Sequence, residues 1–169
     1  MIILGVDTAI RCTGYGVVRF NSLNSIDILD CGVIKNPQKL LHSDCLRRLA
    51  GGTRELIKTY SPAAVSIEDL FYSKNVKTAM ILSLARGAVI TATAELDLPI
   101  YTYSPKTAKR AAVGMGQASK EQVATMMAAM FNIDISQIPN DATDALAIAI
   151  CHGQLAMRDG IDLIKDNQI

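Results

Sequence analysis

The segment Ile2-Ile3-Leu4-Gly5-Val6-Asp7 is a short apolar run, rich in β-branched residues, that ends in a carboxylate. Such a run predicts a buried strand, and its uniformly apolar character favours a central place in a sheet. A second run, Ala63-Ala64-Val65-Ser66-Ile67-Glu68, also ends in an acid. A strand of this kind carries a charge to the rim of the sheet, where α/β proteins place their ligands.

The remaining pattern predicts an α/β fold with a five-stranded mixed sheet flanked by helices. Further strands are expected over 13–18, 26–34 and 98–103, so that a three-strand meander precedes two parallel strands. Helices are expected over 44–60, 76–96, from Pro105, up to Phe131 and over 141–157. We expect one domain over 1–157 and a frayed tail over 158–169.

Three helix starts carry recognisable signals. Ser104 precedes Pro105, which suits the first helical position. Gln122 stands three residues after Ser119, as in a capping box, and Asn140 is expected to cap the last helix.

The bulk composition excludes several classes of protein. The chain has 169 residues, 50% of them hydrophobic, and a formal net charge of +1, so any surface for nucleic acid must be local. The four cysteines lie in no metal or redox spacing and suit a reducing cytoplasm. We find no signal-peptide pattern and no apolar run that reads as a membrane span, and therefore expect a cytoplasmic protein without a membrane partner.

Four carboxylates form the candidate active site, Asp7, Glu68, Asp141 and Asp144. Asp141 and Asp144 are three residues apart and share one helix face. Four clustered acids repel one another unless cations hold them, and hard oxygen ligands suit Mg²⁺ or Mn²⁺. Two such ions about 4 Å apart are a common device for phosphodiester hydrolysis. Three of the acids also have a plainer reading, a helix cap with a solvated acid for Asp141 and Asp144 and a turn former for Asp7.

Two glycines follow Asp7 in the segment Thr13-Gly14-Tyr15-Gly16. One interpretation is close approach of the backbone to a phosphate. The other is a bulge or tight packing against the sheet. The residue pattern leaves both open.

Six segments resemble the RuvC family of bacterial Holliday-junction resolvases, which have a ribonuclease-H-like fold. They are LGVD from Leu4, RCTGYG from Arg11, SIEDLFYSKN from Ser66, LARG from Leu84, AAVGMGQASKEQV from Ala111 and DATDALAIAICH from Asp141. The resemblance implies a homodimeric, Mg²⁺-dependent endonuclease with two metal ions per subunit, held by the four acids. It also implies recombination and repair as its setting, and partners of the RuvA and RuvB type. One departure is Thr8-Ala9-Ile10, where the family usually has Pro-Gly-Ser.

Contacts to a four-way junction are expected around these acids. Phe71 resembles the family's stacking aromatic, with a core position as the alternative, and Tyr72 is a weaker candidate. Lys109 and Lys120 match the family in a stretch without acids, and Lys120 is expected near the scissile phosphate; a solvated helix face is the plainer reading. Arg86 is expected either in a DNA groove or paired with an acid. The remaining candidate contacts are Lys74, Lys77, Lys106 and Arg110.

Three other functions compete with a junction-cleaving nuclease. An actin-like or sugar-kinase-type phosphotransferase needs two similar halves, and the chain holds one. A nuclease for RNA–DNA hybrids shares the fold but explains the aromatic loop and the lysines less well. A non-catalytic junction binder gains nothing from four acids beside phosphates. The expected helix around Ala85 and Gly87 has small residues on one face, which suits close packing against either a partner helix or the sheet.

Overall fold

The computed structural model describes residues 1–69, 75–114, 116–131, 138–159 and 166–169. Its centre is a five-stranded sheet in the order β3-β2-β1-β4-β5, with β1 in the middle as predicted. The strands are β1 (Ile2–Asp7), β2 (Cys12–Ser22), β3 (Ser25–Lys35), β4 (Ala64–Glu68) and β5 (Ile100–Tyr103). β1, β2 and β3 pair antiparallel, whereas β4 pairs parallel with β1 and with β5. The predicted meander and parallel pair are therefore confirmed.

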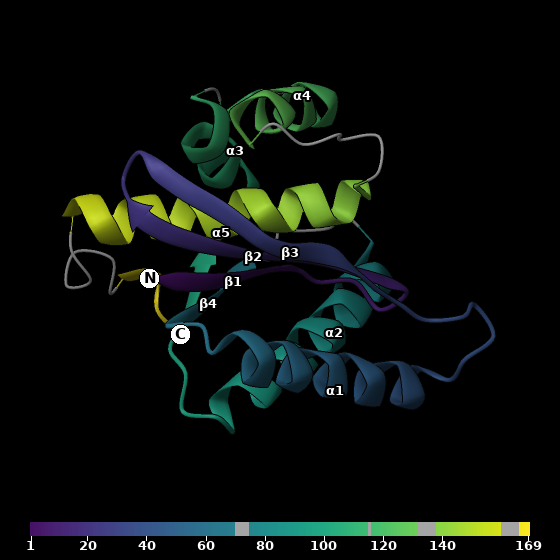
Figure 1. Ribbon diagram of the computed structural model, residues 1–169. Helices are drawn as coiled ribbons and strands as arrows, with labels where there is room; N and C mark the ends of the chain where they lie inside the picture. Colours follow the sequence, from purple (N-terminus) through teal and green to yellow (C-terminus); the bar gives the residue numbers. More distant parts are fainter. Residues whose placement is uncertain (70–74, 115, 132–137, 160–165) are drawn as a thin grey trace.

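Helices cover both faces of this sheet (Figure 1). α5 crosses one face, with α3 and α4 beyond it, and α1 and α2 cover the other. The helices are α1 (His42–Tyr60), α2 (Val76–Ala94), α3 (Pro105–Val113), α4 (Lys120–Phe131) and α5 (Asn140–Asp159).

Two of the predicted helix starts are confirmed. The Thr107 N–H donates to the Ser104 hydroxyl at 3.1 Å, ahead of Pro105. At α4 the Gln122 N–H donates to Ser119 Oγ at 3.2 Å, and the Ser119 N–H donates to the Gln122 side chain at 2.8 Å. Two donors of the first turn are thus satisfied reciprocally, as in a capping box.

The third prediction, an Asn140 cap, is wrong by one residue. α5 begins at Asn140 itself, and the Pro139 carbonyl accepts the Thr143 N–H at 3.1 Å. Asp141 therefore lies in the first helical turn, where the helix dipole favours an anion.

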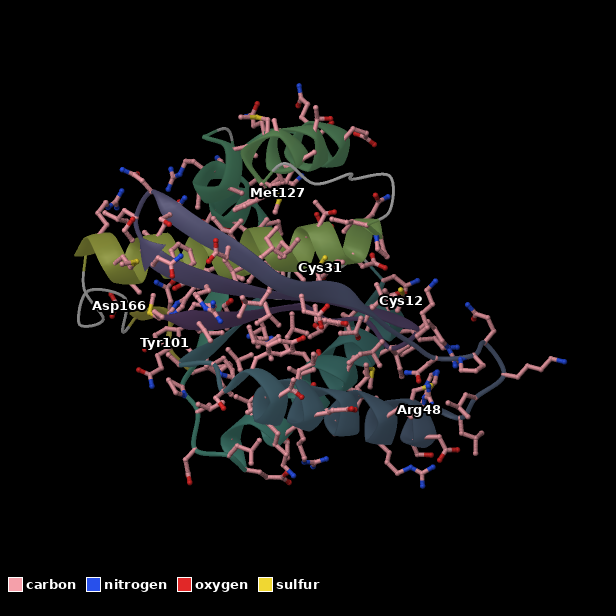
Figure 2. All side chains as sticks on the ribbon, viewed as in Figure 1. Cys12, Cys31, Arg48, Tyr101, Met127 and Asp166 are labelled. Carbon is pink, nitrogen blue, oxygen red and sulfur yellow. The ribbon has the colours of Figure 1, made fainter. Side chains whose placement is uncertain are left out.

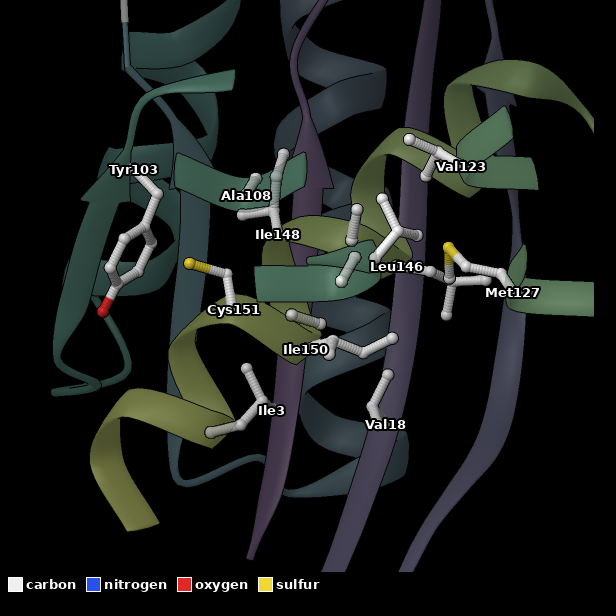
Figure 3. Packing of buried hydrophobic residues seen from close by; sticks show 14 of the residues in the cluster. Ile3, Val18, Tyr103, Ala108, Val123, Met127, Leu146, Ile148, Ile150 and Cys151 are labelled. Atoms are coloured by element: carbon white, nitrogen blue, oxygen red, sulfur yellow. The ribbon is translucent and has the colours of Figure 1, made fainter. Parts of the chain in front are cut away.

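Side chains alternate between the two faces of β1 and β4, because successive residues of a strand point to opposite sides. Ile3 and Ala64 belong to the core beneath α5, and Leu4 and Val65 to the core beneath α1 and α2. Figure 3 shows the α5 side of the sheet, with Ile3 and Val18 facing Ile150 on α5.

The end of the chain returns to the sheet. Gln168 forms an antiparallel bridge with Tyr101, and the Ile169 N–H donates to the Ile100 carbonyl at 3.0 Å. Tyr101 and Asp166 accordingly lie at the same end of the molecule (Figure 2). The last four residues differ from the frayed tail expected from sequence, since backbone pairing with an edge strand holds them.

One helix in the described part of the chain, α2, is long and apolar enough to cross a membrane by length and composition. This finding differs from the expectation that no apolar run is long enough to span a membrane. Core helices of globular proteins have the same composition, and α2 buries Ala85, Arg86 and Val89.

Candidate active site

Asp7 and Glu68 end two neighbouring parallel strands. Val6 pairs with Ile67, so the acids follow at the same level of the sheet. Asp7 is two residues from Gly5, whose Cα faces the backbone of α5, and Glu68 is two residues from Ser66, the partner of Gly5. The alternation of the strands therefore turns both carboxylates toward α5.

The first turn of α5 lies over the same end of the sheet. Gly14 pairs with Asp7 across β1 and β2, and a Cβ at Gly14 would collide with the Asp141 carbonyl and lie 2.8 Å from the Ala142 nitrogen. The absence of a side chain at Gly14 thus lets Asp141 approach Asp7. Of the two readings left open for Gly14, the structure supports tight packing, here against a helix.

The other three acids act electrostatically on Asp7. The pKa of Asp7 is raised to about 8, chiefly by burial and also by the charges of Glu68, Asp144 and Asp141 and a side-chain hydrogen bond to Glu68. A hydrogen bond that raises a carboxyl pKa is one that the protonated form donates. In the absence of a compensating cation, protonated Asp7 therefore donates a hydrogen bond to Glu68.

The donor set fits a hard divalent cation in chemistry and in charge, because it offers four carboxylates around one partly buried point. Among the described residues, no three Asp, Glu, His or Cys side chains are placed to hold one metal ion together. The acids lie close enough to Asp7 to act on it electrostatically, but in the described part of the chain they do not form a ready three-ligand cage.

The loop after Asp7, which departs from the family pattern, is anchored in the protein. Ile10 is buried against Cys45 and Leu49 of α1, and its carbonyl accepts from Asn36 Nδ2 at 2.8 Å. The Ala9 N–H donates to Thr13 Oγ1 at 3.2 Å. Thr8-Ala9-Ile10 therefore forms an ordered turn that leads from Asp7 into β2.

Cys12 is a neighbour of the site that sequence reasoning missed. Burial, followed by a hydrogen bond to Asp141, raises the pKa of its thiol to about 11. The two-residue period of a strand could have identified it, because Cys12 lies two residues before Gly14 and therefore on the same face of β2.

The predicted basic contacts divide into two groups. Lys106 and Arg110 are exposed on α3, whereas Lys109 Nζ donates to the Ala118 carbonyl at 3.0 Å and so ties α3 to the segment before α4. Arg110 lines a cleft of about 600 Å³ with Leu23 and Arg158. Arg158 is 17 residues beyond Asp141 on α5, roughly 25 Å at the helical rise, so Arg110 does not lie with the acids.

The contacts expected after β4 are only partly within the described residues. Phe71, Tyr72 and Lys74 lie outside them, as does the side chain of Lys120, the first residue of α4. Lys77 is exposed in the first turn of α2. Arg86 is buried, and the charge of Asp69 acts on its guanidinium, whose pKa burial lowers. That environment favours pairing with an acid over a DNA groove.

Comparison with known proteins gives one consistent result. The family model described as crossover junction endodeoxyribonuclease RuvC matches residues 3–152. Proteins of that name from Alkaliphilus metalliredigens and Protochlamydia amoebophila are both 41% identical to this chain. The first alignment covers 90% of this chain and 92% of the relative, and the second covers 92% of each.

The solved structures agree with the sequence relatives. Thermus thermophilus RuvC in complex with a Holliday junction substrate superposes with a TM-score of 0.87 at 30% identity, covering 95% of this chain and 97% of that one. The yeast mitochondrial Holliday junction resolvase Ydc2, at 14% identity and a TM-score of 0.64, shares the fold. The ribonuclease-H-like architecture is thus confirmed, and the chain belongs to the RuvC family of crossover junction endodeoxyribonucleases.

Proposed function

We propose that this protein is a Mg²⁺-dependent endonuclease that resolves four-way DNA junctions by paired phosphodiester hydrolysis in recombination and repair. The observation that carries the proposal is the convergence of acids from β1, β4 and α5 on Asp7. Membership of the RuvC family and similarity to a RuvC structure determined with a Holliday junction support the substrate.

Asp7, Glu68, Asp141 and Asp144 are the residues that would hold the ions, two per subunit, with Mn²⁺ as a substitute. When bound, such ions activate water and stabilise charge on the phosphoryl oxygens. The protein supplies the carboxylates and the partly buried setting that strengthens their electrostatic interactions. It also packs β1 against α5 at Gly5 and β2 against α5 at Gly14, which brings segments distant in sequence together.

The residues around the acids are proposed to hold DNA. Lys120 is proposed near the scissile phosphate and Phe71 as a base-stacking side chain, with Tyr72 as a weaker contact. Phosphate contacts are proposed for Lys74, Lys77, Lys106, Lys109 and Arg110. Arg86 is the weakest of the candidates, because its side chain is buried beside Asp69.

We also propose a homodimer built on α2. Val76, Met80 and Leu84 recur every four residues on this helix and are 71%, 65% and 51% exposed. Side chains four apart form one stripe on a helix, and an exposed apolar stripe suits a partner surface. A two-fold dimer presents two active sites related by the same symmetry as a junction, which accounts for paired nicks.

The wider setting follows from the family resemblance. We propose that residues 1–157 act as one nuclease domain in the cytoplasm, with partners of the RuvA and RuvB type. The alternatives are cleavage of RNA–DNA hybrids by the same acids and, less favoured, junction binding without cleavage.

The decisive experiment maps products on a synthetic four-way junction, a plain duplex and an RNA–DNA hybrid, with Mg²⁺ or with a chelator. We expect paired nicks on the junction, dependent on Mg²⁺. The Asp7→Asn variant should bind the junction and lose at least about a hundredfold in cleavage rate, the scale of removing a group that stabilises the transition state. Asp97→Asn is the matched control, because Asp97 is exposed with φ 55°, a conformation that Asn tolerates.

The outcomes separate the competing functions. Undiminished cleavage by Asp7→Asn would refute the assignment of the acids. Preferred cleavage of the hybrid would replace the junction as substrate. Binding without any cleavage by the wild-type protein would leave only the junction binder.

A further inference from the structure

A basic surface lies beside the acids and includes none of the residues assigned above. We call it the α1 basic surface and define it by residues at the ends of β2, β3 and α1, namely Arg11, Lys35, Lys39, Arg47 and Arg48. Residues 8–12 and 31–48 contain one acid, Asp44, which Arg47 contacts at 2.8 Å. Five positive charges against one negative charge leave +4 here, compared with +1 for the whole chain.

Neutral groups hold two of its arginines in place. Arg48 Nε donates to Asn36 Oδ1 at 2.9 Å and its Nη2 to the Lys35 carbonyl at 3.3 Å. Arg11 Nη1 donates to the Pro37 carbonyl at 2.7 Å. Acceptors of this kind fix a guanidinium without cancelling its charge, so less side-chain ordering is needed when an anion binds.

The surface adjoins the acid cluster through the strand register. Lys35 pairs with Cys12 across β2 and β3, and the Cys12 thiol is hydrogen-bonded to Asp141. Two strand spacings and two residues along the strand separate Lys35 from Asp7, roughly 12 Å. Figure 2 shows Cys12 and Arg48 at the same end of the molecule.

We propose that the α1 basic surface binds the phosphate backbone of a duplex arm that leaves the junction next to the cleavage point. This inference rests on the function proposed above. A separation of roughly 12 Å corresponds to about three or four base pairs along a duplex, so a strand cut at the acids continues over this surface. The first turn of α1, where Leu41 provides no side-chain cap, adds the positive end of a helix dipole.

The test removes exposed charges that hold no part of the fold. Lys35→Ala/Lys39→Ala is compared with Lys58→Ala/Arg19→Ala, which removes two exposed charges at the other ends of α1 and β2. Affinity for a synthetic four-way junction is measured by fluorescence anisotropy in chelator, between about 0.05 and 0.3 M salt. Circular dichroism confirms folding, and product mapping with Mg²⁺ is repeated for each protein.

Loss of two phosphate contacts should reduce the slope of log affinity against log salt by about 1.8, and should weaken binding at about 0.1 M salt at least tenfold. The control should keep the wild-type slope. Equal salt slopes in all three proteins, or equal losses of affinity in both double variants, would overturn the inference. Binding of an acidic protein would then be the remaining role for this surface. Failure of the wild-type protein to cut junctions would instead overturn the proposed function, so the two failures are distinguishable.

Discussion

Asp7 is a carboxyl group surrounded by other carboxyl groups at the end of the central strand. Its pKa of about 8 reflects burial first and then the charges of its neighbours. The residues that allow this crowding are glycines, because α5 can approach β1 and β2 only where no Cβ stands between them. A Cβ at Gly5 would collide with the Ala145 carbonyl and lie 2.8 Å from the Ala149 nitrogen.

Gly5→Ala should therefore destabilise the protein by about 1–3 kcal/mol, because backbone atoms of a packed helix cannot move aside as a flexible side chain can. Displacement of α5 should also lower junction cleavage. Gly51→Ala in α1 is the matched control: nothing lies within 4 Å of its added methyl group. Alanine at this helical position should stabilise by about 0.5–1 kcal/mol. Urea unfolding measures both changes, and equal stability of Gly5→Ala and wild type would contradict the packing argument.

A buried contact joins β5 to α5. Tyr103 Oη lies 2.8 Å from His152 Nδ1, and the Tyr101 and His152 ring centroids are 4.3 Å apart. Tyr103 pairs with Glu68 in the sheet, and His152 follows Asp144 by just over two helical turns. The contact thus joins β5, the neighbour of the strand that carries Glu68, to the helix that carries Asp144.

Burial lowers the pKa of His152 to about 4. Its unfolded form takes up a proton below about pH 6.5 and its folded form only below about pH 4, so unfolding is favoured as the pH falls between these values. The contribution is on the order of 3 kcal/mol across this window. His152→Gln should flatten the dependence, measured by urea unfolding from pH 7 to pH 4.5.

In metal-free protein the raised pKa of Asp7 has the opposite effect on stability. Its folded form binds a proton that the unfolded form has lost, so the folded state gains stability as the pH falls below about 8. The difference between wild type and His152→Gln isolates the histidine, because both proteins retain Asp7. Parallel curves for the two proteins would show that His152 titrates alike in the folded and unfolded states.

The molecule as a whole has the acids proposed to be catalytic at one end of its sheet and an exposed apolar stripe on α2. Met80→Glu places a charge in that stripe and should convert the proposed dimer to a monomer in sedimentation experiments. Each monomer should still nick junctions, but the two nicks should become uncoupled in time. Leu23→Glu is the control, because Leu23 is 43% exposed at the β2–β3 turn, away from α2. A dimeric Met80→Glu protein would place the interface elsewhere.

The local pattern of amino acids predicted a large part of this molecule. The apolar runs ending at Asp7 and Glu68, the Ser119 capping box and the central position of β1 are properties of neighbouring residues and of strand and helix periodicity. Such signals act over a few residues and can therefore be read along the chain. The resemblance to RuvC rested on segments of the same kind.

Packing between distant segments decided what the pattern left open. Gly14 makes room for the backbone of α5, Arg86 is buried beside Asp69, and Lys109 donates to the Ala118 carbonyl. The charge of Arg48 is oriented by Asn36, twelve residues away along the chain. A glycine, a lysine or an arginine has the same local signature in each of its possible roles. Only the residues brought against it by the fold, and the water they exclude, determine which role it takes.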